Sequence, residues 1–408
     1  MFTLSATRKT TACLLAAGMM AGALTTEARS QCSLQYADYI LAGVSGPYDF
    51  SFTETFRQAT LSGNKLYTIQ ELDYDYNSIN YHEYTLQIWD ASNPYNLTLI
   101  SESVPRDTQF FEYYKEELEV IGNTMAGLDP ASNIALYDIT DPLHPLLVNT
   151  IDLPGSVYAL HEYNGLLFVR SGFPDALDII DISNPATPVT VGSLGSAPVG
   201  FNPGQPVDGR MPYIWRNPTF DWMIGMLDIS DPANIQVLGS AQASNNATPS
   251  EPVIVGNAVA FEDASGVFEI FDFTDPMNPF HTVDVPSPDG SIKEYVSAGL
   301  FLYFGAGFDY LYAIDLSSPD APVIVDGPVD SVYDQQLLTA GGVLVVRFRD
   351  SGHGEIECYD VNSCALQPTV TNSPFSRLVD AGPTPQHFVV VANDATNYQW
   401  FNANLPLF

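Results

Sequence analysis

Residues 177–185 read LDIIDISNP, and this phrase decides the fold because it recurs along the chain. It consists of an apolar run, an Asp, one more apolar residue, a Ser or Thr, an Asp or Asn, and a Pro. Close copies end at Pro94, Pro142, Pro232, Pro276 and Pro319, and a degenerate copy, IECYDVNSC, ends at Cys364. Such self-similarity indicates a repeat architecture. The central residue recurs every 43–48 positions, at Asp90, Asp138, Asp181, Asp228, Asp272, Asp315 and Asp360.

An eighth copy lies at the end of the chain. Residues 398–406 read YQWFNANLP, which keeps the aromatic run and the final Pro but has Asn402 in place of the Asp. We refer to the seven Asp residues as the anchors and to each stretch of about 45 residues as a unit.

Each unit also has a hairpin signal before its anchor, flanked by apolar and aromatic strand formers. Gly and Asn favour the positive φ angles of tight hairpin turns. The pairs are Gly63-Asn64, Gly122-Asn123, Asn164-Gly165, Asp208-Gly209, Gly256-Asn257, Ala298-Gly299, Gly341-Gly342 and Gly382-Pro383.

Each unit therefore predicts four short antiparallel strands: two around the hairpin, one ending at the anchor, and one after the Pro turn. Four-stranded units at this period are typical of a β-propeller. We predict an all-β, eight-bladed propeller; seven blades is the alternative if the Tyr398 copy is not a true third strand.

The ring has to close, and the first strand-like segment predicts how. Residues 36–46, YADYILAGVSG, resemble the fourth strand of a unit that lacks its first three strands. The last unit ends soon after its third strand. We therefore predict that the N-terminal strand completes the C-terminal blade.

The repeated phrase resembles that of the LVIVD-repeat proteins of prokaryotic cell surfaces, most clearly at residues 177–185. The resemblance covers residues 36–408. It implies a β-propeller, export from the cytoplasm and no established enzymatic activity. The pattern brings no catalytic residues to transfer.

The first thirty residues have the features of a secretory signal peptide. Arg8 and Lys9 precede the apolar stretch 11–24, and Ala28-Arg29-Ser30 offers a cleavage site before Gln31. We expect residues 1–30 to be removed and residues 31–408 to form one propeller domain without a transmembrane segment. The resulting location is the periplasm, the cell surface or the medium.

The cysteines are compatible with one disulfide in that oxidising location. Cys32, Cys358 and Cys364 remain after removal of the signal. We expect a bridge between Cys358 and Cys364, across the turn in which Cys364 replaces the usual Pro. A Cys32–Cys364 bridge is the alternative, and the sequence leaves the pairing open.

The charge restricts the partners. The chain has 48 acidic and 14 basic side chains, a net charge of −34. Phosphate binding needs basic patches, so we expect no nucleic-acid partner. We expect a monomer that binds an unknown protein or glycan of the envelope.

We interpret the anchors as structural. Asp and Ser in such turns hydrogen-bond to backbone amides, and one anchor per blade cannot converge on a ligand. The segment Asp73-Tyr-Asp75-Tyr-Asn77 resembles the start of a calcium loop, but Ser78 and Tyr84 stand where Gly and Glu are required, which favours a solvated acidic loop. The six His show no zinc-ligand spacing, and we expect no cofactor.

The first strand of each blade lines the channel of a propeller, so polar residues on these strands are candidate contacts at the channel mouth. Counting five or six residues back from each hairpin turn gives Arg57, Glu116, Tyr158, Asn202, Glu251, Glu294, Gln335 and Arg377.

These features predict an exported, non-catalytic binding scaffold, because the repeats account for nearly the whole mature chain and leave little room for a catalytic insertion. The alternative is a calcium-dependent hydrolase or lyase with its site in the channel. Such a site needs converging carboxylates, for which Glu116, Glu251 and Glu294 are the candidates.

Overall fold

The computed structural model describes 16 segments of the chain, all within the compact unit Cys32–Phe408. These segments are residues 36–42, 51–76, 79–93, 97–106, 109–111, 118–172, 175–195, 197–244, 250–307, 310–330, 335–340, 343–348, 354–360, 376–380, 387–394 and 397–402.

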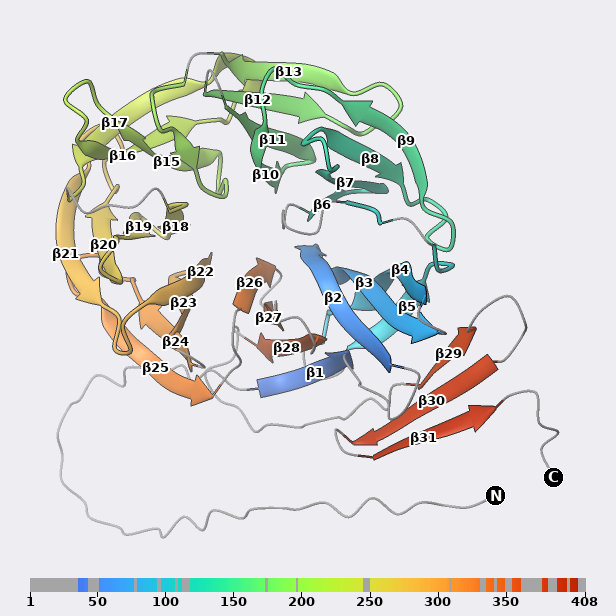
Figure 1. Cartoon of the computed structure of the whole chain (residues 1–408). Helices are drawn as coiled ribbons and strands as arrows, with labels where there is room; N and C mark the ends of the chain where they lie inside the picture. Colours follow the sequence, from blue (N-terminus) through green and yellow to red (C-terminus); the bar gives the residue numbers. More distant parts are fainter. Residues whose placement is uncertain are drawn as a thin grey trace, which may run out of the picture. The chain divides into compact units, whose positions relative to one another are not determined.

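Six blades are built from four consecutive strands, each paired antiparallel with the next, and they stand around a common centre (Figure 1). The first three are β2 (Ser51–Ser62), β3 (Lys65–Tyr76), β4 (Ile79–Asp90) and β5 (Thr98–Glu102); β6 (Leu118–Ile121), β7 (Thr124–Leu128), β8 (Ile134–Asp138) and β9 (Leu146–Ile151); and β10 (Val157–Tyr163), β11 (Leu166–Ser171), β12 (Ala176–Asp181) and β13 (Val189–Leu194). The next three are β14 (Asn202–Pro203), β15 (Arg210–Arg216), β16 (Trp222–Asp228) and β17 (Gln236–Gln242); β18 (Val253–Val255), β19 (Ala258–Glu262), β20 (Val267–Asp272) and β21 (Phe280–Pro286); and β22 (Ile292–Ala298), β23 (Phe301–Ala306), β24 (Tyr310–Asp315) and β25 (Val323–Asp330).

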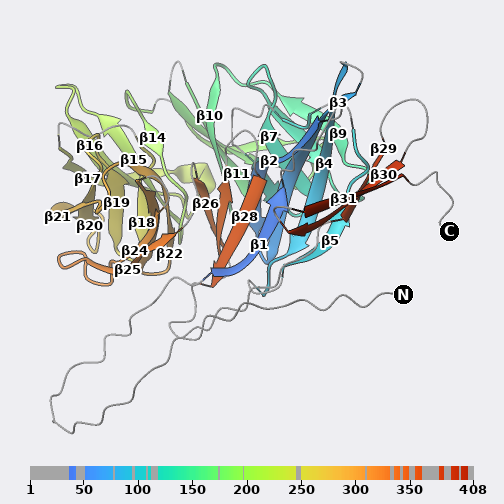
Figure 2. The ribbon, with the colours of Figure 1, turned by 60° about the horizontal axis from the view of Figure 1, so that its bottom comes forward.

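A further four-stranded sheet, which we call the closing sheet, joins the two ends of this series. It contains β26 (Gln335–Ala340), β27 (Val343–Phe348), β28 (Gly354–Asp360) and the N-terminal strand β1 (Tyr36–Ala42). β1 pairs antiparallel with β28, with Tyr36 opposite Tyr359 and Ala42 opposite Gly354. Figure 2 shows the two strands side by side, next to β2.

This arrangement corrects two predictions. The described residues form six blades of consecutive strands where eight, or alternatively seven, were predicted. The N-terminal strand does supply the outer strand of a sheet, but it completes the unit of Asp360 rather than the unit of Asn402. The final unit forms a separate three-stranded sheet of β29 (Ser376–Asp380), β30 (His387–Asp394) and β31 (Asn397–Asn402).

The repeated phrase places the end of the third strand in every unit. The seven anchors and Asn402 are the last residues of β4, β8, β12, β16, β20, β24, β28 and β31. Two-residue turns join the first two strands at Gly63-Asn64, Gly122-Asn123, Asn164-Gly165 and Gly256-Asn257, as predicted, and Gly63 has a φ of 60°. In the sixth blade the turn is Gly299-Leu300, one residue later than predicted.

Neighbouring blades are held together by apolar side chains between their faces. Between the first and second blades, Tyr67 and Leu86 pack with Val120, Met125 and Tyr137. Equivalent buried clusters lie between each later pair of blades, as between Phe268 of the fifth blade and Phe304 of the sixth, whose rings meet edge to face at 5.0 Å. Burial of these faces is the main stabilising contribution in such a stack.

In several blades the turn after the anchor also contacts the outer strand of the preceding blade. The Gly239 N–H on β17 donates to the Pro276 carbonyl at 2.8 Å. The Thr282 hydroxyl on β21 donates to the Pro319 carbonyl at 2.8 Å. A Cβ atom on Gly192 of β13 would collide with the Pro232 carbonyl. Small residues on the outer strands thus admit the Pro turn of the next blade.

The other face of the first blade differs, because it is largely polar. Thr68, Gln70, Thr85 and Gln87 are fully buried there, and β2 of this blade lies beside β26, β27 and β28 of the closing sheet. The Gln87 side-chain N–H donates to Gln70 Oε1 at 2.8 Å, and the Trp89 indole N–H donates to the Thr68 hydroxyl at 3.2 Å. We call this face the polar seam.

Residues 73–76 belong to a strand and not to the expected loop. β3 and β4 continue as one long hairpin, with Asp73 opposite His82 and Asp75 opposite Asn80; Asn77 lies outside the described residues. Within the described residues the only helix is the single 3₁₀ turn Pro232–Asn234, and no helix there has the length and apolar character needed to cross a membrane.

Candidate functional site: the central cavity

The first strands of the blades surround a cavity of about 880 Å³ at the centre of the ring. Residues of β2, β6, β10, β14, β18, β22 and β26 line it, with contributions from the turn after β14 and from the segment before β18. Figure 1 shows β2, β6, β10, β18, β22 and β26 nearest the centre. A cavity of this size, reached by side chains from every blade, is typical of a small-ligand site.

The cavity is strongly acidic. Among the described residues that line it, none is Lys or Arg, whereas five are Glu. They come from five different strands or segments of the ring: Glu119 from β6, Glu162 from β10, Glu251 from the segment before β18, Glu262 from β19 and Glu294 from β22.

Two of these carboxyls titrate at unusually high pH. Burial raises the pKa of Glu119 to about 8, and the charges of Glu162 and, more weakly, Glu251 add to the effect. Burial also raises the pKa of Glu262 to about 7, with a smaller contribution from the charge of Asp263. Desolvation and like charges both favour the neutral carboxylic acid, so the ring holds protons here near neutral pH.

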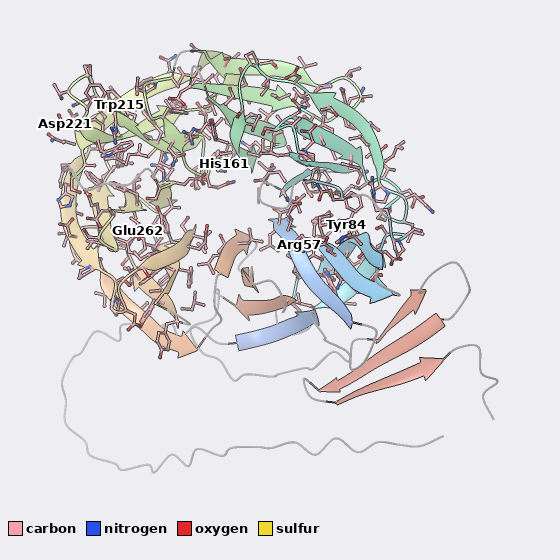
Figure 3. The ribbon with its side chains drawn as sticks, viewed as in Figure 1. Arg57, Tyr84, His161, Trp215, Asp221 and Glu262 are labelled. Carbon is pink, nitrogen blue, oxygen red and sulfur yellow. The ribbon has the colours of Figure 1, made fainter. Side chains whose placement is uncertain are left out.

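Tyrosine and histidine side chains complete the polar lining. The Tyr295 hydroxyl donates to the Glu251 carbonyl at 2.7 Å and accepts the Glu262 N–H at 3.3 Å, which ties β22 to its neighbouring blade. His161 on β10 is 7% exposed, and its Nε2 atom has no hydrogen-bond partner among the described residues. Figure 3 labels His161 and Glu262 on the inner sides of their blades.

Three of the candidate channel residues, Asn202, Glu251 and Glu294, line this cavity together. Tyr158 does not line it; its ring is 46% exposed and packs against the guanidinium of Arg170, which also donates to Asn202 Oδ1 at 2.7 Å. Arg57 donates instead to Glu71 within its own blade.

The side chains of the other three candidates lie outside the described part of the structure, so their relation to the cavity stays a prediction. Glu116 lies outside the described residues. Gln335 is the first residue of β26, and Arg377 lies on β29 of the separate three-stranded sheet.

Counting along the first strands missed Glu119, Glu162 and Glu262. Glu119 and Glu162 lie two or three residues before their hairpin turns, closer than the five or six that were counted. A count of two or three would have found both. Glu262 belongs to a second strand, β19, and no hairpin count predicts its presence at the cavity.

The six anchors whose side chains are described accept hydrogen bonds in their own turns. In every case the donor is the backbone N–H two residues later, as from Ser183 to Asp181 at 2.8 Å and from Thr274 to Asp272 at 2.7 Å. The hydrogen bonds from Ser183 hold the pKa of Asp181 below its usual value. None of these six lines the cavity. The side chain of Asp360 lies outside the described part of the structure.

The cavity glutamates are spread apart rather than gathered. Among the described residues only one group, Glu269, His281 and Asp284, brings three ligand-type atoms within 4.8 Å of one another, and it lies on β20 and β21, outside the cavity lining. Its members already have partners: Glu269 accepts the Ser244 N–H at 2.9 Å, and His281 Nε2 is 2.8 Å from Asp284 Oδ1.

Two solved structures are similar to the ring. The β-propeller domain of Cps50 (Swd1) from Myceliophteria thermophila is 12% identical, with a TM-score of 0.47, over 76% of this chain and all of that one. The computationally designed Ika8 protein is 11% identical, with a TM-score of 0.45, over 80% of this chain and all of that one. No curated protein matches the sequence.

The family comparison agrees with the repeat. The model of the LVIVD repeat matches residues 173–195, which contain β12 and β13 and the phrase quoted first above. The same phrase ends the third strand of every unit. The chain therefore contains an LVIVD repeat within a β-propeller fold.

Proposed function

We propose that this protein is an exported, non-catalytic binding scaffold that uses its rigid ring to hold a partner in the cell envelope or outside the cell. The observation that carries the proposal is the central cavity, to which side chains from every blade contribute. A stack of blades fixes such side chains relative to one another, which favours recognition.

The signal-like first thirty residues and the usual export of LVIVD-repeat proteins support the location. The anchors support the scaffold role, because each described carboxylate accepts a hydrogen bond in its own turn and lies outside the cavity.

The test has two parts. Expression of the full chain in a bacterial host, followed by fractionation and N-terminal sequencing, should give a product that begins at Gln31 outside the cytoplasm. The purified product, immobilised, should retain one defined envelope protein or glycan, and retention should fall in the Glu251→Gln/Glu294→Gln variant. A cytoplasmic product that still begins at Met1 would refute export. Equal retention by wild type and variant would refute the cavity as the binding site.

A further inference from the structure

The cavity has an unbalanced charge that a ligand could neutralise. Glu119, Glu162, Glu251 and Glu262 contribute carboxyls to one space whose described lining has no Lys or Arg. Glu119, Glu162 and Glu262 are partly buried and Glu251 is exposed. Partly desolvated acidic groups without cations repel one another, which is unfavourable unless a partner of opposite charge enters. Walls of one charge sign also concentrate the field inside the cleft and draw counter-ions into it.

An independent observation at the same cavity is the unpaired nitrogen of His161. Its side chain is 7% exposed, and Nε2 has no hydrogen-bond partner among the described residues, although His161 is part of the cavity lining. Buried polar atoms nearly always have a partner in native structures, so an exception needs an explanation. A neutral imidazole can accept a hydrogen bond from an ammonium group at this atom.

The spacing of the carboxyls indicates the shape of the ligand. No three of the cavity's described carboxylate and imidazole groups lie within 4.8 Å of one another, so they do not form a three-ligand cradle for one metal ion. The cavity volume of about 880 Å³ is in the range of small organic ligands. Leu118, Val253 and Val296 also line the cavity and add apolar atoms against which methylene groups can pack.

We propose that the cavity binds an extended organic polycation of the linear polyamine class, with its ammonium groups distributed over glutamates of different blades. This inference rests on the proposed binding function and specifies its ligand chemistry. Tyr163 and Tyr295 also belong to the lining, and aromatic rings attract ammonium groups.

Binding should be coupled to proton release. The charged groups that act on Glu119 are Glu162 on β10 and Glu251 before β18, and His161 lines the same cavity. Asp263 and Tyr295 interact with Glu262. An ammonium group beside Glu119 or Glu262 stabilises the charged carboxylate and displaces the proton held near neutral pH. Affinity should therefore increase as the pH rises from about 6 to about 8.5.

The experiment is a calorimetric titration of the mature chain with spermine, and with putrescine, butylamine and Ca²⁺ for comparison, at fixed ionic strength. We expect one saturable spermine site, an affinity that decreases as the number of amines falls, and no Ca²⁺ binding at that site. Repeating the titration at pH 7 in two buffers of different ionisation enthalpy should reveal protons released on binding.

The variant Glu119→Gln/Glu251→Gln should weaken spermine binding at least tenfold. The control Asp152→Asn/Asp320→Asn removes the same charge from exposed sites outside the cavity and should change affinity less than twofold. Equal weakening of spermine binding in both variants would show attraction to the net charge alone and would overturn the proposal. Displacement of spermine by an equal concentration of Ca²⁺ would also overturn it.

The proposal can be tested even if the cavity variant does not fold, because proton release and the pH profile are measured on the wild-type chain. Failure to bind spermine, or binding without proton release and without an increase at high pH, would contradict the site. Neither result affects retention of an envelope partner, so the two proposals can fail separately.

Discussion

Carboxyl groups have opposite surroundings in the anchor turns and in the central cavity of this ring. The anchor carboxylates accept backbone N–H groups in exposed turns, and these hydrogen bonds lower the pKa of Asp181. Glu119 in the cavity faces other carboxyls, and its pKa is raised to about 8. The position in the repeat therefore determines whether a carboxylate stabilises the fold when charged or when neutral.

For the anchors, Asp181→Ala should lower the free energy of unfolding by about 0.5–1.5 kcal/mol, because the Ser183 N–H loses its acceptor. The folded pKa of Asp181 is lowered, so the stabilisation is present above its ordinary value of 3.8 and is lost as the pH falls through the folded pKa. Urea unfolding at pH 7 and pH 2.5 measures both effects. Asp152→Ala is the control, and an equal loss in both variants would contradict the role.

For the cavity, Glu119→Gln should stabilise the ring at high pH. The folded pKa is raised, so the stabilisation from the neutral carboxyl is complete below about 4.5 and is lost as the pH rises through about 8. The amide cannot ionise and avoids this loss. We expect its Tm to exceed the wild-type Tm by about 2–4 °C at pH 8.5 and to match it at pH 4. A gain that does not depend on pH would be inconsistent with this explanation.

At the scale of elements, the repeat predicted where strands lie better than it predicted which strands pair. The anchors fixed the end of each third strand, and the Gly-Asn pairs fixed most hairpins, because both signals depend on local backbone geometry. The partner of β1 is a long-range choice between two available sheet edges, which a local pattern does not encode. Glu262 was missed because it lies on the second strand, β19, which the count along first strands did not include.

The contact between an outer strand and the next Pro turn gives a prediction at this scale. Gly239→Ala places a Cβ against the carbonyls of Pro276 and Met277, which are backbone atoms that cannot move aside easily. We expect a loss of about 1–3 kcal/mol, as for overpacking elsewhere. Ser240→Ala, on the exposed side of the same strand, should be nearly neutral. Thermal unfolding compares the two, and equal stability of Gly239→Ala and wild type would exclude the contact.

At the scale of the whole molecule, closure depends on one strand from the start of the chain. β1 covers the edge of β28, which otherwise presents unpaired N–H and C=O groups to solvent. The sequence predicted this kind of closure but assigned it to the wrong sheet.

Deletion of residues 36–42 should therefore expose that edge, lower the Tm and promote aggregation, which light scattering during a thermal ramp detects. A chain beginning at Cys32 retains β1 and is the control. A deletion variant with the Tm and solubility of this control would show that β1 does not close the ring.

The register of β1 and β28 also bears on the disulfide. Tyr36 lies opposite Tyr359 in an antiparallel pair, so the first residue of β1 and the last residue of β28, Asp360, lie at the same end of the sheet. We therefore expect Cys32 to pair with Cys364, although both lie outside the described residues. Peptide mapping without reduction should find that link. A Cys358–Cys364 peptide, or three thiols open to alkylation, would disprove it.

The polar seam has a consequence for the order of synthesis. The first blade is complete long before residues 335–360 emerge, so the face that later meets β26, β27 and β28 stays uncovered for most of the chain's production. An apolar face left open that long invites association with other chains. The polar side chains of this face can hydrogen-bond to water before the closing sheet forms and to one another afterwards; they are Thr68, Gln70, Thr85 and Gln87. The polar seam is thus suited to stay exposed to water, without promoting aggregation, until the closing sheet covers it.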